Sequence, residues 1–161
     1  MNLTLITEAE MDIPFLLQLY AQSRAAELEV VPWTTQQKQQ FLEGQFMLQR
    51  KHYYQFYDRA RFELILFDGI PVGRLYVHTD IEIRLMDIIV SQEYQQRGIA
   101  TWCFQRLFQE SESSNLDITL HVEINNHARN WYKRLGFTEL EDQNEASGMS
   151  VKMLRRAKSA S

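Results

Sequence analysis

One turn in the sequence has the residue types of an anion-binding site. The stretch IIVSQEYQQRGIATWCFQRLF (88–108) passes from an apolar run, through a polar turn with one glycine, into an amphipathic pattern. A strand that enters a helix through such a turn presents free backbone N–H groups, and together with the helix dipole these favour a bound anion such as phosphate. Gly98 lets the backbone approach a ligand closely, and Arg97 adds charge at the rim. A turn glycine without a ligand is the alternative.

The hydrophobic periodicity predicts four helices around this turn. Apolar residues recur at helical spacing over 13–27, and a capping box of Thr7 and Glu10 is expected before them. A second helix, capped by Thr34 or Thr35, continues to about residue 57, and Gly44 weakens it by roughly 1 kcal/mol, enough to bend or divide it. The third helix follows the turn, and the fourth covers 125–136 and ends at a glycine, as helices often do.

The remaining segments have the period of two that is typical of strands. They are 3–6, 61–67, 70–78, 82–90, 116–124, 137–142 and 148–154. An Asp68-Gly69 turn and a turn near Asp80 join three of them into consecutive antiparallel strands. The order β-α-α-β-β-β-α-β-α-β-β predicts one α+β domain over 1–155, with a mixed, mostly antiparallel sheet of about seven strands and about four helices. Residues 156–161 are expected to form a flexible tail.

Composition limits the class of protein. The chain has 161 residues, 45% hydrophobic and 24% charged, and 17 Lys and Arg against 21 Asp and Glu give a net charge of −4. This balance argues against nucleic-acid or acidic-membrane partners. The single cysteine, Cys103, excludes an internal disulfide and suits a reducing cytosol. Without a signal peptide or a membrane-length apolar run, the sequence predicts a cytoplasmic protein. The sequence is compatible with a homodimer and does not determine the oligomeric state.

Two motifs in order resemble those of the GNAT (GCN5-related N-acetyltransferase) superfamily. QQRGIA (95–100) fits Gln/Arg-x-x-Gly-x-Gly/Ala, with Ala100 in the place of the second glycine. The later segment 126–137 fits Asn-x-Ala-x-x-x-Tyr-x-x-x-Gly-Phe, through Asn126, Ala128, Tyr132, Gly136 and Phe137. The resemblance covers the element order of nearly the whole chain, and the motifs cover the part from Ile83 to Phe137.

The resemblance implies acetyl-CoA as a co-substrate, and no metal. It implies that the backbone of 88–90 pairs with the pantetheine arm, that the N–H groups of 96–101 hold the pyrophosphate, and that an asparagine bonds the pantetheine. The residues carried over are Ile88, Ile89, Val90, Gln95, Gln96, Arg97, Gly98, Ile99, Ala100, Thr101 and Asn126.

The implied reaction is direct transfer of acetyl to a neutral amine. By resemblance Tyr132 protonates the departing thiolate, although its helical face also suits a core aromatic. The acceptor must lose a proton, and the candidate bases are Glu82 and Asp87. A regular strand would place these two acids on opposite faces of the sheet. A bulge would reverse the alternation and turn Asp87 toward the face that Glu82 would otherwise occupy. A structural ion pair with Arg74 or Arg84 is the alternative for either acid.

The resemblance places the acceptor between the first two helices and the central strands. A polar interruption in the apolar stripe of the second helix, together with polar residues of the central strands, predicts its lining: Gln45, Gln49, Tyr53, Arg74, Tyr76 and Arg84. Two arginines would suit an acceptor with a carboxylate. A core stripe with glutamines at its edge is the alternative. For the whole chain, the rival hypothesis is a non-catalytic acyl-CoA-binding or regulatory module on the same fold.

Overall fold

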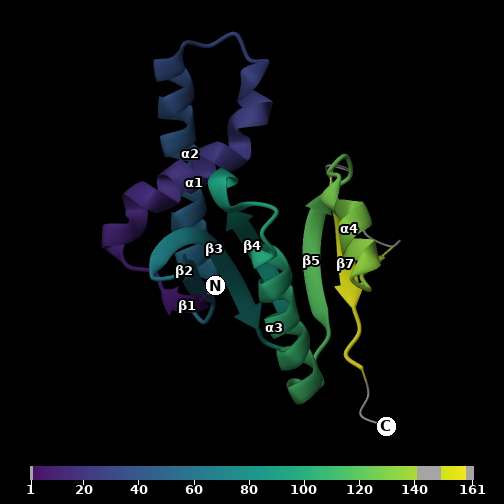
Figure 1. The fold of residues 1–161 in the computed structure, drawn as a ribbon. Coiled ribbons are helices and arrows are strands. Elements are labelled where there is room, and N and C mark those ends of the chain that lie inside the picture. The colour runs from purple at the N-terminus through teal and green to yellow at the C-terminus, as the bar shows by residue number, and fades with distance from the viewer. Residues whose placement is uncertain (1, 141–149, 159–161) are drawn as a thin grey trace. The chain divides into compact units, whose positions relative to one another are not determined.

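The order of elements agrees with the prediction. A computed structural model describes residues 2–140 and 150–158 (Figure 1). The helices are α1 (Ile13–Glu29), α2 (Thr35–Phe56), α3 (Ile99–Ser114) and α4 (Ala128–Arg134), with short 3-10 turns η1 (Glu10–Asp12) and η2 (Gln92–Tyr94). The strands are β1 (Leu3–Thr7), β2 (Arg61–Phe67), β3 (Ile70–Thr79), β4 (Ile83–Val90), β5 (Ile118–Glu123), β6 (Thr138–Glu139) and β7 (Ser150–Arg155).

The strands form one open, mixed sheet, as predicted. Across the described residues it has seven strands in the order β1-β2-β3-β4-β5-β7-β6. Strand β4 pairs with β5 in parallel through Ile83 and Arg84, whereas β1 with β2, β5 with β7 and β6 with β7 are antiparallel. Of the two last predicted strands, the parts within 141–149 lie outside the described residues.

The chain divides into two compact units, and β3, β4 and α3 each contribute residues to both. The first unit comprises Met1–Tyr76 and Asp87–Ala100, and the second comprises Val77–Met86 and Thr101–Ser161. In the first unit, Leu16 and Tyr20 of α1 pack with Phe46 of α2 and Leu64 of β2. The rings of Tyr20 and Phe46 lie 5.7 Å apart, which fixes the α1–α2 pair over the strands.

The second unit is built around one face of α3. Cys103, Phe104 and Leu107 of that helix are buried, as its 3.6-residue period predicts. The Phe104 ring lies 5.8 Å from that of Tyr132 on α4 and 6.1 Å from that of Phe137. The tyrosine of the second motif is therefore held by aromatic packing.

The start of α1 differs from the prediction. Thr7 ends β1, and α1 begins at Ile13 after the η1 turn. The Asp12 carboxylate accepts a hydrogen bond from the Ala9 N–H at 2.8 Å, in place of the expected Thr7–Glu10 capping box. The prediction was wrong because a strand residue cannot also cap a helix that starts six positions later.

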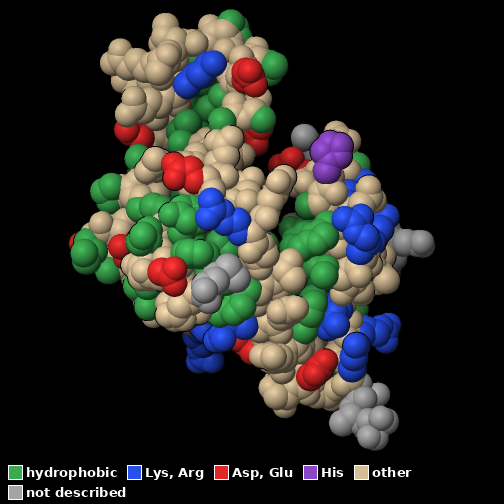
Figure 2. Space-filling model, viewed as in Figure 1, with side chains coloured by type: hydrophobic (Ala, Val, Ile, Leu, Met, Phe, Trp, Pro, Cys, Tyr) green, Lys and Arg blue, Asp and Glu red, His purple; other side chains and the backbone are tan. Residues whose placement is uncertain are grey.

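Helix α2 is continuous through Gly44, against the expected bend or division. Its N-terminus has a full capping box: the Thr34 hydroxyl accepts from the Gln37 N–H at 3.1 Å, and the Gln37 side chain accepts from the Thr34 N–H at 2.9 Å. Packing of Phe46 against α1 outweighs the propensity loss at one glycine. On the face shown in Figure 2, the hairpin of α1 and α2 at the top carries mostly uncharged side chains, with both acidic and basic ones among them.

Helix α4 ends at Arg134, and the glycine predicted at its end, Gly136, lies just past its C-cap, Leu135. This glycine has φ of 100°, and the Phe137 N–H donates to the Tyr132 carbonyl at 3.0 Å. Among the helices that the structure describes, none combines the length and apolarity needed to span a bilayer.

Candidate active site

The segment between β4 and α3 has the geometry of an anion cradle. Gln96 and Gly98 have positive φ values of 64° and 81°, which turn the chain sharply before α3. Among the described residues, the N–H groups of 96–98 donate to no backbone carbonyl. A Cβ built on Gly98 would meet nothing within 4 Å, so the space above the turn is open. The open space and unpaired donors at the helix N-terminus together fit a bound phosphate.

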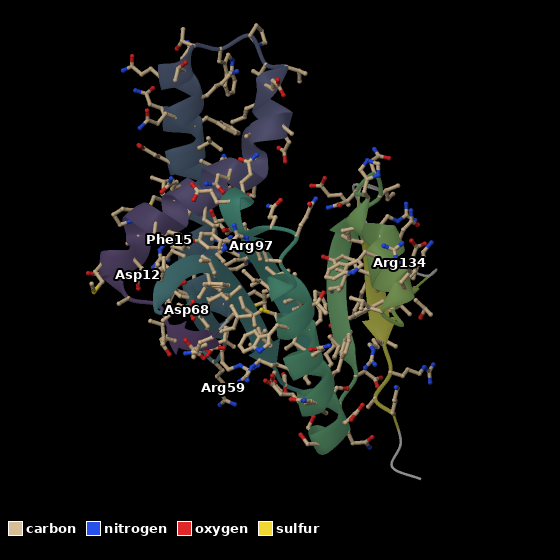
Figure 3. The ribbon with its side chains drawn as sticks, in the orientation of Figure 1. Asp12, Phe15, Arg59, Asp68, Arg97 and Arg134 are labelled. Carbon is tan, nitrogen blue, oxygen red and sulfur yellow. The ribbon has the colours of Figure 1, made fainter. Side chains whose placement is uncertain are left out.

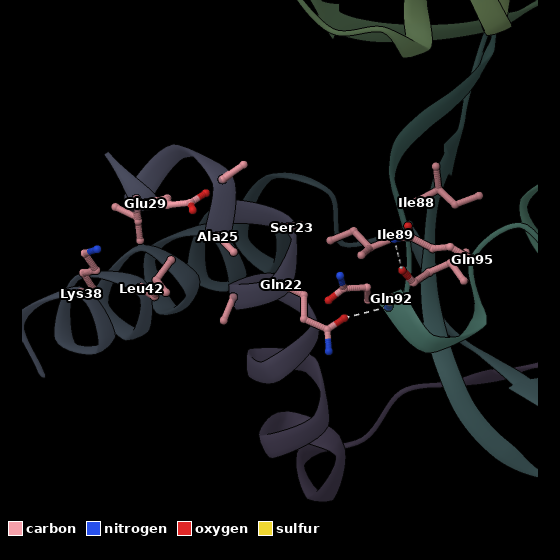
Figure 4. A pocket seen from close by; sticks show the side chains of 14 residues that line it. Gln22, Ser23, Ala25, Glu29, Lys38, Leu42, Ile88, Ile89, Gln92 and Gln95 are labelled. Carbon is pink, nitrogen blue, oxygen red and sulfur yellow. Dashed lines mark hydrogen bonds between the residues drawn. The ribbon is translucent and has the colours of Figure 1, made fainter. Parts of the chain in front are cut away.

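Side chains hold this turn in place. Gln95 donates from Nε2 to the Val90 carbonyl at 3.0 Å, and the Gln92 N–H donates to Gln22 Oε1 of α1 at 2.9 Å (Figure 4). The guanidinium of Arg97, labelled in Figure 3, lies 5.0 Å from the centre of the Tyr94 ring. The turn is thus preorganised, with a cation stacked at its rim.

The end of β4 lies unusually close to β3 at Gly73. A Cβ on this buried glycine would come within 2.4 Å of the Ile89 carbonyl oxygen and 3.2 Å of the Val90 Cα. No side chain other than hydrogen fits there. The backbone of 88–90, which carries the predicted pantetheine contacts, is therefore set by a backbone-to-backbone contact.

A buried arginine joins three of the predicted site residues. Arg74 is 0% exposed, and its Nε and Nη2 both donate to Asp87 Oδ2, the former at 2.9 Å. Nη2 also donates to Gln49 Oε1 at 2.9 Å. Burial, the largest single effect, would lower the pKa of Arg74, but the charges and hydrogen bonds of its neighbours, Asp87 first among them, together outweigh burial and the pKa is raised. Asp87 thus forms an ion pair with Arg74, which was the structural alternative to a base; its role as the base stays a prediction.

A buried acid that was not predicted, Glu8, lies in the same unit. Its carboxylate accepts hydrogen bonds from Arg50 Nη1 at 2.7 Å, from the Tyr54 hydroxyl at 2.9 Å and from the Tyr76 hydroxyl. Burial and then the Glu8 hydrogen bond raise the pKa of Tyr54 to about 12. The pKa of Tyr76 is also raised, chiefly by burial. Arg74 lies 4.6 Å from the centre of the Tyr76 ring, which connects this cluster to Asp87.

Glu82, the other candidate base, has different partners. It accepts from the Thr119 hydroxyl of β5 at 3.1 Å, and Lys152 Nζ of β7 lies 3.7 Å away. These contacts belong to the second unit. Lys152 and Thr119 therefore hold Glu82, whereas the ion pair with Arg74, which was the alternative for either acid, is formed by Asp87.

A cavity of about 790 Å³ lies within the first unit (Figure 4). Its wall is the C-terminal half of α1, Lys38 and Leu42 of α2, the 88–90 segment of β4, and Gln92 and Gln95. The six predicted acceptor residues are not part of this lining. Gln49, Arg74 and Tyr76 lie in the buried network, and Tyr53 packs against the Phe62 and Tyr76 rings. Gln45 and Arg84 are half-buried elsewhere.

In the second unit, the residues of the later motif lie around α4. Asn126 Oδ1 accepts from the Ala128 N–H at 2.8 Å, which leaves its amide nitrogen as the group to offer a ligand. Tyr132 is half-buried, with its ring packed on Phe104 and on Phe137. Arg129 donates to Glu139 Oε1 from Nε at 2.8 Å, and this hydrogen bond lowers the pKa of Glu139. The pair ties α4 to β6.

A comparison with known protein families identifies the family of this chain. Residues 30–155 match the acetyltransferase (GNAT) domain family. This protein belongs to the GNAT acetyltransferase family. Among curated proteins, none matches the sequence significantly.

Solved structures support the GNAT fold. The PaiA N-acetyltransferase of Thermoplasma acidophilum, in complex with coenzyme A, superposes with a TM-score of 0.70 at 13% identity, over 97% of this chain and 99% of that one. An acetyltransferase of Thermus thermophilus gives 0.68 at 17% identity, over 97% of both chains. The ribosomal-protein-S18-alanine N-acetyltransferase of Escherichia coli gives 0.63 at 18% identity, over 99% and 97%. At such identities the likeness concerns the fold.

Within this GNAT domain, the first unit gathers most of the predicted residues. The short η2 segment joins the 88–90 strand end to the turn from Gln95 to Ala100, and the strand end lines the cavity. Thr101, Asn126 and Tyr132 belong to the second unit. The sequence analysis named neither the buried acid Glu8 nor the cavity residues Gln22, Glu29 and Lys38. The position of Glu8 directly after a strand was one available signal. Its three hydrogen-bond donors, however, come from segments far away in the sequence.

Proposed function

We propose that this protein is an acetyl-CoA-dependent N-acetyltransferase that moves acetyl directly to a primary amine of a small molecule, peptide or protein. The observation that carries the proposal is the turn from Gln95 to Gly98, with its unpaired N–H groups, positive φ values and open space. Membership of the GNAT family supports the same cofactor.

Acetyl-CoA would supply an activated thioester. The N–H groups of 96–101 would hold its pyrophosphate, and Arg97 would add charge beside them. The backbone of 88–90 would pair with the pantetheine arm as an added strand, and the amide nitrogen of Asn126 would donate to it. Fixing the thioester beside the amine would contribute much of the rate acceleration.

Two side chains would move protons. Tyr132 would donate its hydroxyl proton to the departing thiolate, since its packed ring holds the hydroxyl in one place. Asp87 is the better candidate for the base, directly or through water. Arg74 uses only Oδ2 of that carboxylate, and the Asp87 side chain is 24% exposed. Glu82 is the weaker candidate because Thr119 and Lys152 hold it.

An amine panel with detection of released thiol tests this function. The native protein should release CoA from acetyl-CoA in the presence of at least one primary amine. Tyr132→Phe should keep acetyl-CoA affinity and lower kcat by roughly 10²-fold, because only the proton donor is lost. Tight acetyl-CoA binding without turnover across the panel would instead support the non-catalytic module. Unchanged kcat in Tyr132→Phe would remove the tyrosine from the mechanism.

A further inference from the structure

The cavity of the first unit has two opposite charges at one end. Glu29 of α1 and Lys38 of α2 both line it, and Figure 4 shows them at the end away from β4. Among the described residues, neither side chain forms an ion pair, with the other or with a third group. Two unpaired, opposite charges in one cavity can bind a group that itself carries both signs.

The helix ends reinforce each charge. Glu29 is the last residue of α1, where the helix dipole is negative, so a ligand ammonium would be favoured there. Lys38 lies in the first turn of α2, where the dipole is positive, so a ligand carboxylate would be favoured beside it. The loop between the helices brings these two termini together.

The rest of the cavity lining is mixed, and its other end is the β4 strand. Ala21, Ala25, Ala26 and Leu42 are apolar, and the polar Gln22 and Ser23 lie between the charged end and Ile88–Val90. The buried arginine cannot replace Lys38 as a carboxylate ligand, because Arg74 is fully buried and does not line this cavity. The lining therefore fits a molecule with a doubly charged head, an aliphatic body and a reacting group at β4.

The length of the cavity limits how long the aliphatic body of the ligand can be. Gln22 bonds the turn after β4, and Glu29 lies seven residues further along α1, which is about 10 Å at the rise of an α-helix. An extended chain of four methylenes between an amine and Cα spans roughly 6 Å. Charge-assisted hydrogen bonds of about 2.8 Å at the head account for much of the remainder.

We propose that the acceptor is a free diamino acid of the lysine type. Its α-ammonium binds Glu29, its α-carboxylate binds Lys38, and its side-chain amine reacts at the β4 end. This inference rests on the proposed acetyltransferase function. In the reaction, the amine nitrogen forms a bond to the acetyl carbon and the carbon–sulfur bond of the thioester breaks. The ammonium loses two of its three protons: one goes to the base before attack, and the other replaces the proton that Tyr132 gives to the released thiolate.

Four amines of equal reach test the head group. They are L-lysine, 6-aminohexanoate without the α-amine, 1,5-diaminopentane without the carboxylate, and pentylamine without either. The native enzyme should acetylate the side-chain nitrogen of lysine, with kcat/KM at least about tenfold higher than for the other three, since each of the three lacks one or both charge-assisted hydrogen bonds of the head group. Mass spectrometry of the product identifies the acetylated nitrogen.

Substitutions of Glu29 and of Lys38 test which charged group of the acceptor each side chain binds. Glu29→Gln should lower kcat/KM about tenfold for lysine and diaminopentane, and less for aminohexanoate. Lys38→Met should lower it about tenfold for lysine and aminohexanoate, and less for diaminopentane. The matched controls are Glu43→Gln and Lys51→Met on α2, which do not line this cavity and should resemble the native enzyme. Acetyl-CoA affinity and melting temperature, measured for all four, report folding.

The failures of the two proposals are distinguishable. Turnover of pentylamine as efficient as that of lysine would overturn the diamino-acid inference and leave the acetyltransferase function standing. The diamino-acid inference also falls if a lysine peptide blocked at both ends is preferred to free lysine, or if Glu29→Gln and Lys38→Met behave like their controls. No thiol release with any amine would overturn both.

Discussion

Asp87 and Arg74 are the pair whose roles matter most at the scale of single residues. Arg74 donates twice to one oxygen of Asp87 and is itself fully buried. Such a pair can fix the orientation of a base and can also stabilise the fold. Removing one member leaves a buried charge without its partner, which is costly in either case. A variant must therefore be read by activity and stability together.

Asp87→Asn should lower kcat by roughly 10²- to 10⁴-fold if Asp87 is the base. Asparagine keeps the size of the side chain and an oxygen for Arg74, so part of the hydrogen bonding survives. Glu82→Gln is the comparison and should change kcat far less. The measurement is the pH dependence of kcat at temperatures where both variants are folded. If Glu82→Gln loses activity and Asp87→Asn does not, the two assignments must be exchanged.

The tyrosines on Glu8 predict how stability depends on pH. The pKa of Tyr54 is raised to about 12 from the ordinary value of 10, so the folded state favours the protonated phenol. This contribution to stability is fully present below pH 10 and is lost as the pH rises through 12. Tyr76, whose pKa is also raised, acts in the same direction. The free energy of unfolding in urea should therefore fall between pH 10 and 12.

Tyr54→Phe separates the hydroxyl from the ring. The ring stack on Phe62, with centroids 4.4 Å apart, is kept, and the hydroxyl that donates to Glu8 is lost. The variant should be less stable than the native protein at about pH 8, and its stability should fall less steeply above about pH 10. A steeper fall in the variant would show that Tyr54 does not carry the predicted linkage.

At the scale of elements, replacing either of two glycines by alanine should change the stability of the protein, in opposite directions. Gly73→Ala would place a Cβ 2.4 Å from the Ile89 carbonyl oxygen, so β4 must move. We expect a loss of roughly 1–3 kcal/mol of stability and weaker acetyl-CoA binding, because 88–90 shifts. Gly44→Ala, on continuous α2 with nothing within 4 Å of the new Cβ, should instead gain up to about 1 kcal/mol.

Thermal unfolding checks this pair of variants. For a domain of this size, 1 kcal/mol shifts the melting temperature by roughly 2–4 °C. Gly44→Ala should melt higher than the native protein, and Gly73→Ala lower. Equal acetyl-CoA affinity in Gly73→Ala and in the native protein would mean that the approach of β3 to β4 does not position the ligand.

Local patterns explain which elements were predictable. The strands and helices follow from periods of 2 and 3.6, and the cap at Thr34 follows from Gln37 three residues later. The continuity of α2 could not be predicted, since it depends on packing against another helix. The Thr7–Glu10 cap failed for a similar reason: pairing of Thr7 with Glu63 extends β1 through the residue that would have capped.

Among the site residues too, those that lie close together in the sequence were predictable and those brought together by the fold were not. The turn around Gly98 is contiguous in sequence, so its geometry could be predicted. Glu8 receives its hydrogen bonds from residues 42, 46 and 68 positions away, and no pattern within one element reveals such a cluster. The acceptor lining stays a prediction: Gln49, Arg74 and Tyr76 belong to buried networks, and one helix stripe does not tell which side chains such networks hold.

At the scale of the whole molecule, we propose that the turn after β4 binds acetyl-CoA. Isothermal titration of acetyl-CoA into the native protein, Gly98→Glu and Gly69→Glu tests it directly. Both glycines have similar positive φ values, 81° and 82°, and open space around the Cβ position, so the backbone strain is matched. Only Gly98→Glu puts bulk and negative charge into the cradle.

We expect binding by the native protein and by Gly69→Glu, and none by a folded Gly98→Glu. Such a result would establish the cofactor and its site together. Absence of binding to the native protein, or undiminished binding to Gly98→Glu, would contradict the account.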